Sequence, residues 1–275
     1  MIRAKDHTLG ANVENLTAFG STGVGFMFGN TLDNALNAMQ YTGAAGILFE
    51  ANDGNDTVYG SYKADVISGG AGNDTLWGSW GADGYSDQMY GGNGADTYYV
   101  QEALDTVSES NASTAASEID TVYSAINMTL GANLEYLFIY GAATQADGNG
   151  LNNAIIGSYS GLQLSLYGFG GSDSLSGGAG NDTLDGGPGA DILFGSGGAD
   201  TFSFGAGTAN GDAINDFDGA GAGALDSLRF IGYGAGATFT QVNSTQWRVN
   251  YGAGLQETIT FNNGASVHAS DVVFV

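Results

Sequence analysis

The 275-residue chain contains 48 Gly, 29 Asp and Glu, only 5 Lys and Arg, and no Cys, which gives a formal net charge of -24. This charge excludes a nucleic-acid-binding protein, which needs a cationic face, and the missing Cys excludes disulfides and thiolate metal sites. A hydrophobic content of 43% is too high for a disordered chain, and no apolar run reaches the ~20 residues of a membrane span. Because Lys and Arg are so few, another cation must neutralise the acidic residues of the folded protein.

Residues 1–50 form a linking segment that the chain later repeats. Thr8–Leu16 reads TLGANVENL, and Thr129–Leu137 reads TLGANLEYL. Each copy leads into a nine-residue unit in which Asn34 or Asn153 stands at the sixth position. Because the first copy lacks the strand-like residues that precede the second, we expect the chain to be a fragment of a longer protein.

Residues 51–100 form the first block of nine-residue units. After ANDGNDTVY at Ala51 come GSYKADVIS, GGAGNDTLW, a longer copy at Gly78–Tyr90, and GGNGADTYY at Gly91. Each unit is a glycine-rich hexapeptide that ends in Asp, followed by a triplet with an apolar middle residue. Solvated turns rich in Asp and Gly are common, but they do not explain a fixed nine-residue phase.

The second linking segment, residues 101–156, precedes a second block at residues 157–204. This block reads GFGGSDSLS, GGAGNDTLD, GGPGADILF and GSGGADTFS from Gly168 onward. The linking residues show no such phase, and we expect irregular loops at Ala103–Glu118 and Ala142–Asn149. The remainder of the segment should continue the coils of the two blocks.

Residues 205–275 form a distinct tail. The alternation of polar and apolar residues over Thr238–Tyr251 and Glu257–Phe261 predicts strands of a half-buried antiparallel sheet. A repeat solenoid needs a cap over its last apolar layer, and we expect the tail to be this cap. The tail ends in the acidic Asp271 followed by the apolar run Val272-Val-Phe-Val275.

The nine-residue unit predicts a coil built from turns and very short strands. Glycines permit a tight turn with carbonyl groups on its concave side, and the Asp adds a carboxylate there. In the triplet, only the middle residue points inward. Two units make one coil, so unit n lies beside unit n+2. The inward residues that we expect in the core are Val58, Ile67, Leu76, Met89, Tyr98, Leu175, Leu184, Leu193 and Phe202.

Stacked turns of this kind offer only hard oxygen ligands. Carbonyl and carboxylate oxygens suit Ca²⁺, which takes about 6–8 oxygens at about 2.3–2.6 Å. Mg²⁺ fits less well because it prefers a strict octahedron and retains its waters. Zinc would want His or Cys. The unit therefore favours calcium as the missing counter-cation.

The repeated unit resembles the calcium-binding nonapeptide of the repeats-in-toxin (RTX) family over Ala51–Tyr99 and Gly168–Ser203. The resemblance implies an all-β fold, a right-handed parallel β-roll with about four or five Ca²⁺ ions in its stacked turns. It implies carboxylate ligands at Asp56, Asp65, Asp74, Asp87, Asp96, Asp173, Asp182, Asp191 and Asp200. It implies backbone carbonyl ligands at Gly54, Gly70, Gly72, Gly92, Gly94, Gly171, Gly178, Gly180, Gly187, Gly189 and Gly198.

The pairing of unit n with unit n+2 predicts where the metal sites lie. Lys63 stands where a turn glycine belongs, which weakens the site at Asp65. An insertion at Gly84–Ser86 leaves Asp83 and Asp87 as alternative ligands. The Asn-bearing units are expected to stack without metal. The predicted pairs are Asp56/Asp74, Asp65/Asp87, Asp74/Asp96, Asp173/Asp191 and Asp182/Asp200.

The same resemblance implies a route out of a bacterial cell. It identifies Asp271, Val272, Val273, Phe274 and Val275 as an uncleaved signal for type I secretion machinery, and the plain alternative is the last strand of the cap. The chain is then the C-terminal module of a larger secreted protein, extracellular or on the cell surface. Such a module stays unfolded at low cytosolic Ca²⁺ and folds in the millimolar Ca²⁺ outside.

Enzymatic activity is not expected in this chain. Its only histidines, His7 and His268, lie on opposite terminal segments, and it has no GxSxG nucleophile motif. A glycan-binding module is the competing class, because Tyr59, Trp77 and Tyr99 fall on one sheet face, where they could stack on the sugar rings of a polysaccharide. An adhesin or surface-layer module stiffened by calcium is a third class. Packing of the three rings within the protein is the simpler interpretation.

Overall fold

The computed structural model describes residues 6–21, 25–110, 118–157, 161–219 and 226–275, and these are almost entirely β-structure. The one helix among them is the short 3-10 helix η1 (Ala269–Asp271). No helix in these ranges is long and apolar enough to span a membrane. The chain divides into two compact units, residues 1–126 with 131–136, and residues 127–130 with 137–275.

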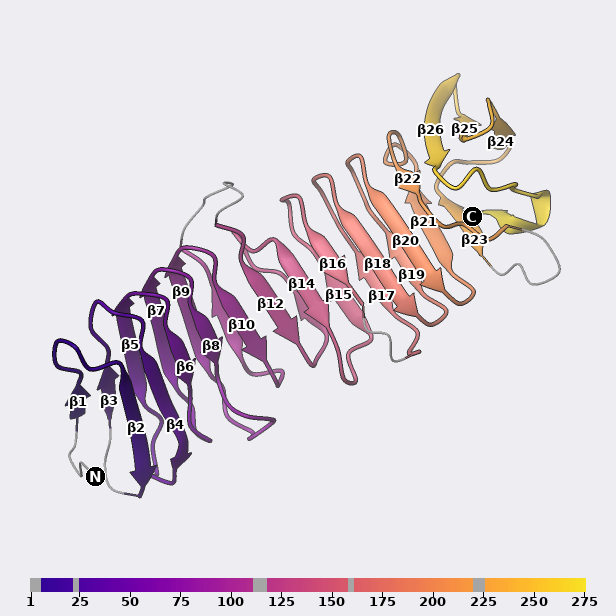
Figure 1. The fold of residues 1–275 in the computed structure, drawn as a ribbon. Coiled ribbons are helices and arrows are strands. Elements are labelled where there is room, and N and C mark those ends of the chain that lie inside the picture. The colour runs from indigo at the N-terminus through magenta and orange to yellow at the C-terminus, as the bar shows by residue number, and fades with distance from the viewer. Residues whose placement is uncertain (1–5, 22–24, 111–117, 158–160, 220–225) are drawn as a thin grey trace. The chain divides into compact units, whose positions relative to one another are not determined.

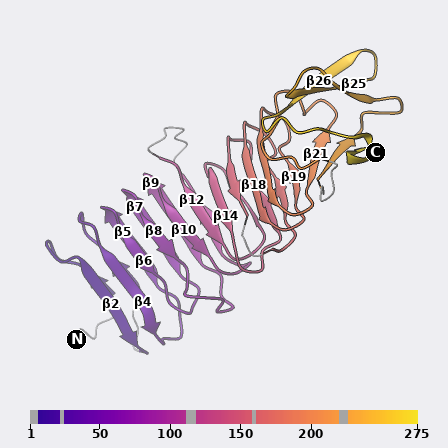
Figure 2. The ribbon, with the colours of Figure 1, turned by 45° about the vertical axis from the view of Figure 1, so that its right-hand side comes forward.

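The N-terminal unit is a parallel β-solenoid with two sheets (Figures 1 and 2). Consecutive strands alternate between the sheets, so two strands make one coil. One sheet has the order β1 (Asp6–Thr8), β3 (Phe26–Phe28), β5 (Leu48–Asp53), β7 (Val66–Ala71), β9 (Gln88–Asn93) and β11 (Thr106–Ser108). The other has the order β2 (Asn15–Gly20), β4 (Ala35–Tyr41), β6 (Thr57–Tyr59), β8 (Thr75–Trp77), β10 (Thr97–Val100) and β12 (Thr121–Ser124).

The C-terminal unit is built in the same way and ends in the cap. Its first sheet is entirely parallel, with the order β13 (Met128–Thr129), β15 (Gln145–Asp147), β17 (Ser165–Tyr167), β19 (Thr183–Asp185), β21 (Thr201–Gly205), β23 (Ser227–Ile231) and β27 (Val272–Phe274). Its second has the order β14 (Tyr136–Ile139), β16 (Ala154–Ile156), β18 (Ser174–Ala179), β20 (Ile192–Gly197), β22 (Ala213–Ile214), β26 (Leu255–Phe261), β25 (Gln246–Tyr251) and β24 (Thr238–Gln241). The last three strands are antiparallel, which confirms the predicted sheet of the tail.

The register of the parallel strands follows the nine-residue unit. Thr57 aligns with Thr75, and Leu48 aligns with Val66. Residues 18 positions apart, such as Asp56 and Asp74, therefore lie on adjacent coils. Two units make one coil, as the sequence predicts.

The core of each unit is a stack of inward-facing residues from the triplets. All nine predicted core residues have an exposed fraction of 0%. Only one residue of each triplet faces inward, so each coil contributes a thin apolar layer and depends on the next coil to cover it. One such row along β4, β6, β8 and β10 consists of Leu36, Val58, Leu76 and Tyr98.

Aromatic side chains fill the last layers under the cap. Phe230 on β23 stacks with Phe204 at 5.5 Å and with Phe274 at 5.1 Å between ring centroids. Phe261 on β26 meets Phe217 edge to face at 5.2 Å. The tail thus buries the end of the apolar stack, as expected of a cap.

The predicted loops of the linking segment are partly wrong. Ala103–Glu118 contains β11, which pairs in register with β9, and residues 111–117 of this range lie outside the described part of the chain. Ala142–Asn149 contains β15, which pairs with both β13 and β17. β15 buries Ala146 and β11 half-buries Val107, each between polar neighbours, so a triplet without glycines still continues the coil.

The stacked core generates a stability prediction. We expect Leu76→Ala to lower the free energy of unfolding by about 2–5 kcal/mol, because it leaves a cavity between the core residues of the two adjacent coils. Denaturant unfolding in saturating Ca²⁺ measures the change, and Glu50→Ala, at an exposed position on β5, is the control. Equal stability of the two variants would contradict the coil-by-coil core.

Candidate metal sites in the stacked turns

The predicted aspartates lie in buried rows that run from coil to coil. Each of the nine has an exposed fraction of 2% or less. Within each predicted pair, the backbone N–H of one Asp donates a hydrogen bond to Oδ1 of the Asp on the next coil. The distances are 2.8 Å for Asp56/Asp74, 2.8 Å for Asp65/Asp87, 2.7 Å for Asp74/Asp96, 2.8 Å for Asp173/Asp191 and 2.8 Å for Asp182/Asp200.

The rows continue into aspartates that our sequence reasoning missed. At the end of each predicted row, the last predicted Asp donates its backbone N–H to Oδ1 of one further Asp. These bonds are 3.2 Å for Asp87/Asp105, 2.8 Å for Asp96/Asp120, 3.0 Å for Asp191/Asp212 and 2.9 Å for Asp200/Asp226. The signal that could have found them is an Asp directly before an alternating triplet, as in Asp105-Thr-Val and Asp120-Thr-Val, without the glycine hexapeptide.

Asparagines occupy the same rows at the other end. Asn34 donates its N–H to Oδ1 of Asp56 at 2.6 Å, and Asn153 donates to Asp173 at 2.7 Å. The Oδ1 atom of Asn34 accepts the N–H of Asn30 within its own turn at 2.7 Å. A neutral amide can thus hold the backbone of a row without bringing charge into it.

The second oxygen of many row carboxylates has no partner. Oδ2 is buried and accepts no hydrogen bond from any described residue in Asp56, Asp74, Asp87, Asp96, Asp173, Asp182 and Asp191. In all of these except Asp56, whose unit begins with Ala51, Oδ2 lies against the first glycine of its own unit, because a Cβ at Gly69, for example, would collide with Oδ2 of Asp74. A buried charged oxygen without a partner needs an explanation, and a bound cation supplies one.

Glycine is required where the turns touch. Gly70 and Gly72 have φ of 115° and 126°, which side chains rarely adopt. A Cβ at Gly72 would also collide with the carbonyl oxygen of Gly54 on the neighbouring coil, and Gly94 meets the carbonyl of Gly72 in the same way. Carbonyl oxygens therefore line the stacked turns. In the second block, the predicted carbonyl glycines with positive φ are Gly171, Gly178, Gly187 and Gly198, whereas Gly180 and Gly189 are not among these.

The two irregular units of the first block differ in their turns. Both oxygens of Asp65 accept hydrogen bonds from Ser61, including its N–H at 2.5 Å, which leaves this carboxylate with partners. The Nζ atom of Lys63 lies 4.4 Å from the ring centroid of Tyr85. In the insertion, Asp87 and not Asp83 takes the place in the row. Among the first-block pairs, Asp65/Asp87 is thus the weakest candidate.

Burial raises the pKa of the row carboxyls. It raises the pKa of Asp74 and Asp87 to about 8, with the neighbouring row carboxylates adding to the effect and the backbone N–H donors opposing it. The pKa of Asp173 rises to about 7 and that of Asp96 to about 6 for the same leading reason. Without a counter-cation, the rows that contain Asp74, Asp87 and Asp173 therefore hold part of their protons near neutral pH.

The aromatic residues of the first block stack on one another. Ring centroids are 6.1 Å apart for Tyr59 and Trp77, 3.5 Å for Trp77 and Tyr99, and 5.0 Å for Tyr99 and Tyr123. Trp80, with an exposed fraction of 56%, lies 5.0 Å from Trp77. The faces of the inner rings thus cover each other, which favours packing within the protein over stacking on sugar rings.

The raised pKa values predict how acid affects the metal-free chain. Because burial raises the pKa of the folded carboxyls well above the ordinary value of 3.8 for Asp, the folded state binds more protons than the unfolded state between about pH 4 and pH 8. We expect the chain in excess chelator to lose stability as the pH rises through this window, as measured by circular dichroism. Excess Ca²⁺ should remove most of this loss, because it binds the deprotonated form.

A matched pair of variants tests the origin of the effect. Asp74→Asn keeps the Oδ1 acceptor and should flatten the pH dependence, whereas Glu50→Gln changes an exposed carboxylate on β5 and should leave it unaltered. Metal-free stability that rises from pH 5 to pH 8 would contradict the assignment.

A family model of a calcium-binding repeat matches the glycine-rich blocks. Residues 50–85, 84–106 and 167–202 match the RTX calcium-binding nonapeptide repeat, in four copies. No curated protein matches the sequence. Among solved structures, the AlgE6R3 subunit of the mannuronan C5-epimerase from Azotobacter vinelandii is similar at 28% identity and a TM-score of 0.35, over 46% of this chain and 80% of that chain.

The extracellular lipase LipA from Serratia marcescens is similar at 22% identity and a TM-score of 0.36, over 93% of this chain. The match spans 41% of the lipase. All the aspartates predicted as ligands fall within the segments that match the repeat. The chain therefore carries RTX calcium-binding nonapeptide repeats in both of its glycine-rich blocks.

Proposed function

We propose that this chain is a structural module that folds when Ca²⁺ fills the stacked turns. The observation that carries the proposal is the set of buried, unpartnered Oδ2 atoms in the rows. Each lies in a turn lined by glycine carbonyls, so two adjacent coils supply only hard oxygen donors. Ca²⁺ accepts such a set at flexible geometry, whereas Mg²⁺ demands a strict octahedron.

The ligand assignments follow the rows. Asp56, Asp74 and Asp96 form one row of the first block and Asp87 belongs to the other, while Asp65 is the weakest ligand because Ser61 satisfies it. In the second block the ligands are Asp173 with Asp191 and Asp182 with Asp200, together with the turn carbonyls. This arrangement would hold about four or five ions.

Filling the sites couples calcium to folding. The chain has a net charge of -24, and its row carboxylates repel one another in a dry environment. At millimolar Ca²⁺ and a Kd of ~10⁻⁴–10⁻³ M, each site adds roughly 0.4–1.5 kcal/mol of stability. Several sites together would shift the chain from unfolded to folded when it leaves a cell with sub-micromolar free Ca²⁺.

The C-terminal residues support export before folding. Val272–Phe274 form β27, which pairs in parallel with β23, and Asp271 is buried. These residues are thus the last strand of the cap in the folded state. Val273 and Val275 are exposed in the folded state, whereas Asp271 is buried and β27 is paired with β23. A type I secretion signal in Asp271–Val275 would therefore be available over its whole length only while the chain is unfolded, which the low cytosolic Ca²⁺ would ensure.

We propose no catalytic role for this chain, and we place any activity elsewhere in a larger secreted parent protein. His7 lies on β1, and His268 precedes η1, where its N–H donates to Asp271 at 2.8 Å. Polysaccharide binding through Tyr59, Trp77 and Tyr99 is the weaker candidate, because these rings stack on each other. An adhesin or surface-layer role would use the same calcium-stiffened coils.

A calcium titration tests the folding mechanism. We expect the far-ultraviolet circular dichroism of the chain in excess chelator at pH 7.5 to lack most β-structure, and millimolar Ca²⁺ to restore it. Asp182→Asn should shift the midpoint to higher Ca²⁺, because it removes charge from a row, whereas Glu50→Gln, at an exposed position on β5, should not. Full β-structure in chelator would refute calcium-coupled folding.

Truncation tests the export role. We expect deletion of residues 271–275 to abolish export through a type I system, measured as protein in the medium. Phe230→Ala removes the ring that stacks on Phe274 at 5.1 Å but leaves the last residues intact, so it should weaken the cap and still be exported. Export of the truncated chain at the wild-type level would exclude a signal in these residues.

A further inference from the structure

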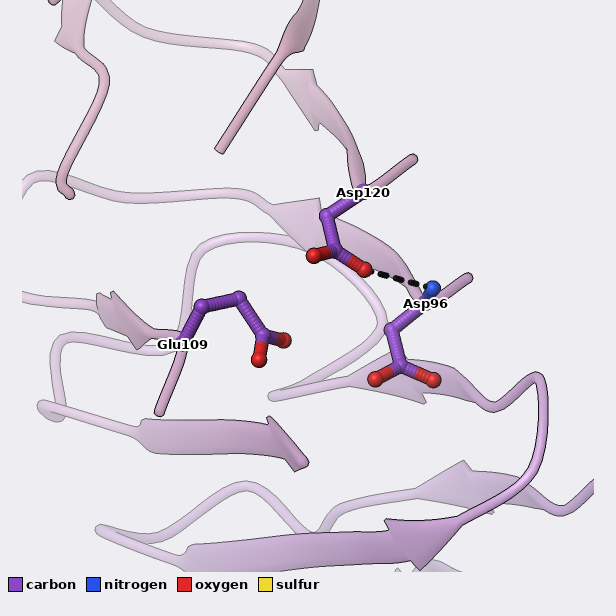
Figure 3. Close-up of side chains that lie close together, drawn as sticks. All are labelled: Asp96, Glu109 and Asp120. Atoms are coloured by element: carbon purple, nitrogen blue, oxygen red, sulfur yellow. Dashed lines mark hydrogen bonds between the residues drawn. The ribbon is translucent and has the colours of Figure 1, made fainter. Parts of the chain in front are cut away.

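Three buried carboxylates meet where the first block ends. Asp96 directly precedes β10, Asp120 directly precedes β12, and Glu109 directly follows β11. One carboxylate oxygen of each lies within 4.8 Å of those of the other two (Figure 3). Their exposed fractions are 1%, 3% and 7%. The cluster is thus almost fully withdrawn from water.

Two of the three carboxylates meet in front of Gly91. Oδ2 of Asp96 is buried and accepts no hydrogen bond from any residue that the structure describes. A Cβ at Gly91 would collide with this atom, with Oε1 of Glu109 and with the hydroxyl of Tyr98 at once. The missing side chain at Gly91 therefore leaves room in which Asp96 and Glu109 face each other.

The other contacts of the cluster hold its side chains in place. Oδ1 of Asp96 accepts the N–H of Asp74 at 2.7 Å, and Oδ1 of Asp120 accepts the N–H of Asp96 at 2.8 Å. The N–H of Gly92 donates to Oε2 of Glu109 at 3.4 Å, and the Tyr98 hydroxyl donates to its Oε1. Each of these donors is neutral, so none of these bonds neutralises the three charges.

The cluster lies where the glycine hexapeptides of the first block end. The residues between Glu109 and Asp120 contain no glycine. The carboxylate of Glu109 lies against the last glycine turn of the block, Gly91–Asp96. Glu109 and Asp120 also lie beyond residue 106, where the matched repeat of the first block ends.

We propose that Asp96, Glu109 and Asp120 bind one additional Ca²⁺ ion that closes the first block. This inference rests on the proposed function, because it assumes that the neighbouring turns fill with the same ion. Three carboxylates without a nitrogen or sulfur ligand favour a hard cation over zinc. Two positive charges neutralise most of a site that would otherwise bury up to three negative ones.

Counting bound ions tests the site. Equilibrium dialysis of the whole chain at saturating Ca²⁺ should give one ion fewer for Glu109→Gln than for the unaltered chain. Glu50→Gln makes the same change at an exposed position in the N-terminal compact unit, which also contains Glu109, and should leave the count unchanged. Circular dichroism in Ca²⁺ should show that both variants keep their β-structure.

Each other outcome overturns a definite part of the argument. An unchanged count in Glu109→Gln refutes the closing site and leaves the glycine-turn sites standing, as would happen if a shared proton held the cluster together. A chain that binds no Ca²⁺ refutes both proposals. Should Glu109→Gln fail to fold, Asp120→Asn, which keeps the Oδ1 acceptor, takes its place in the count. It should lose one ion, and retention of that ion overturns the site.

Discussion

Buried rows of half-satisfied carboxylates are the constraint on which the rest of the molecule depends. One oxygen of each row Asp accepts a backbone N–H from the adjacent coil, as between Asp56 and Asp74, and so ties the coils together. The other oxygen is buried, and in most of the row it has no partner. The same side chain thus stabilises the stacking through one atom and opposes it through the other until a cation arrives. If calcium fills the rows as we propose, this conflict would make it a folding partner of the chain.

The other features of the solenoid fit around these rows. The turns approach so closely that the carbonyl of Gly54 lies where a side chain at Gly72 would be, and therefore a non-glycine residue there would push the coils apart. The thin apolar layers, such as Val58 over Leu76, follow the same spacing. Stacked rings of Trp77 and Tyr99 add contact outside the core. None of these contacts neutralises the carboxylates, so packing and charge act on the same coils in opposite directions.

The regular part of the candidate site was predictable because it is local. The glycine hexapeptide, the Asp and the inward residue recur in one phase, so the five Asp pairs follow from counting along the chain. Asp105 and Asp120 escaped the prediction because their units keep the triplet but lack the glycines. Glu109 gave no signal, because it comes after its triplet and reaches the row only through the fold. The loops predicted at Ala103–Glu118 and Ala142–Asn149 were partly wrong for the same reason, since β11 and β15 form by pairing with neighbours.

The sequence alone determined the coil, its core residues and the kind of cation, because the nine-residue phase and the acidic charge without basic partners are written in the order of residues. Only the tertiary structure decided which oxygens are buried without partners, and that Ser61 satisfies Asp65. It also decided that Asp87 and not Asp83 enters the row, and that Asp96, Glu109 and Asp120 meet. The physical reason is that burial and hydrogen bonding arise between coils, from residues that are distant in the chain and adjacent only after stacking.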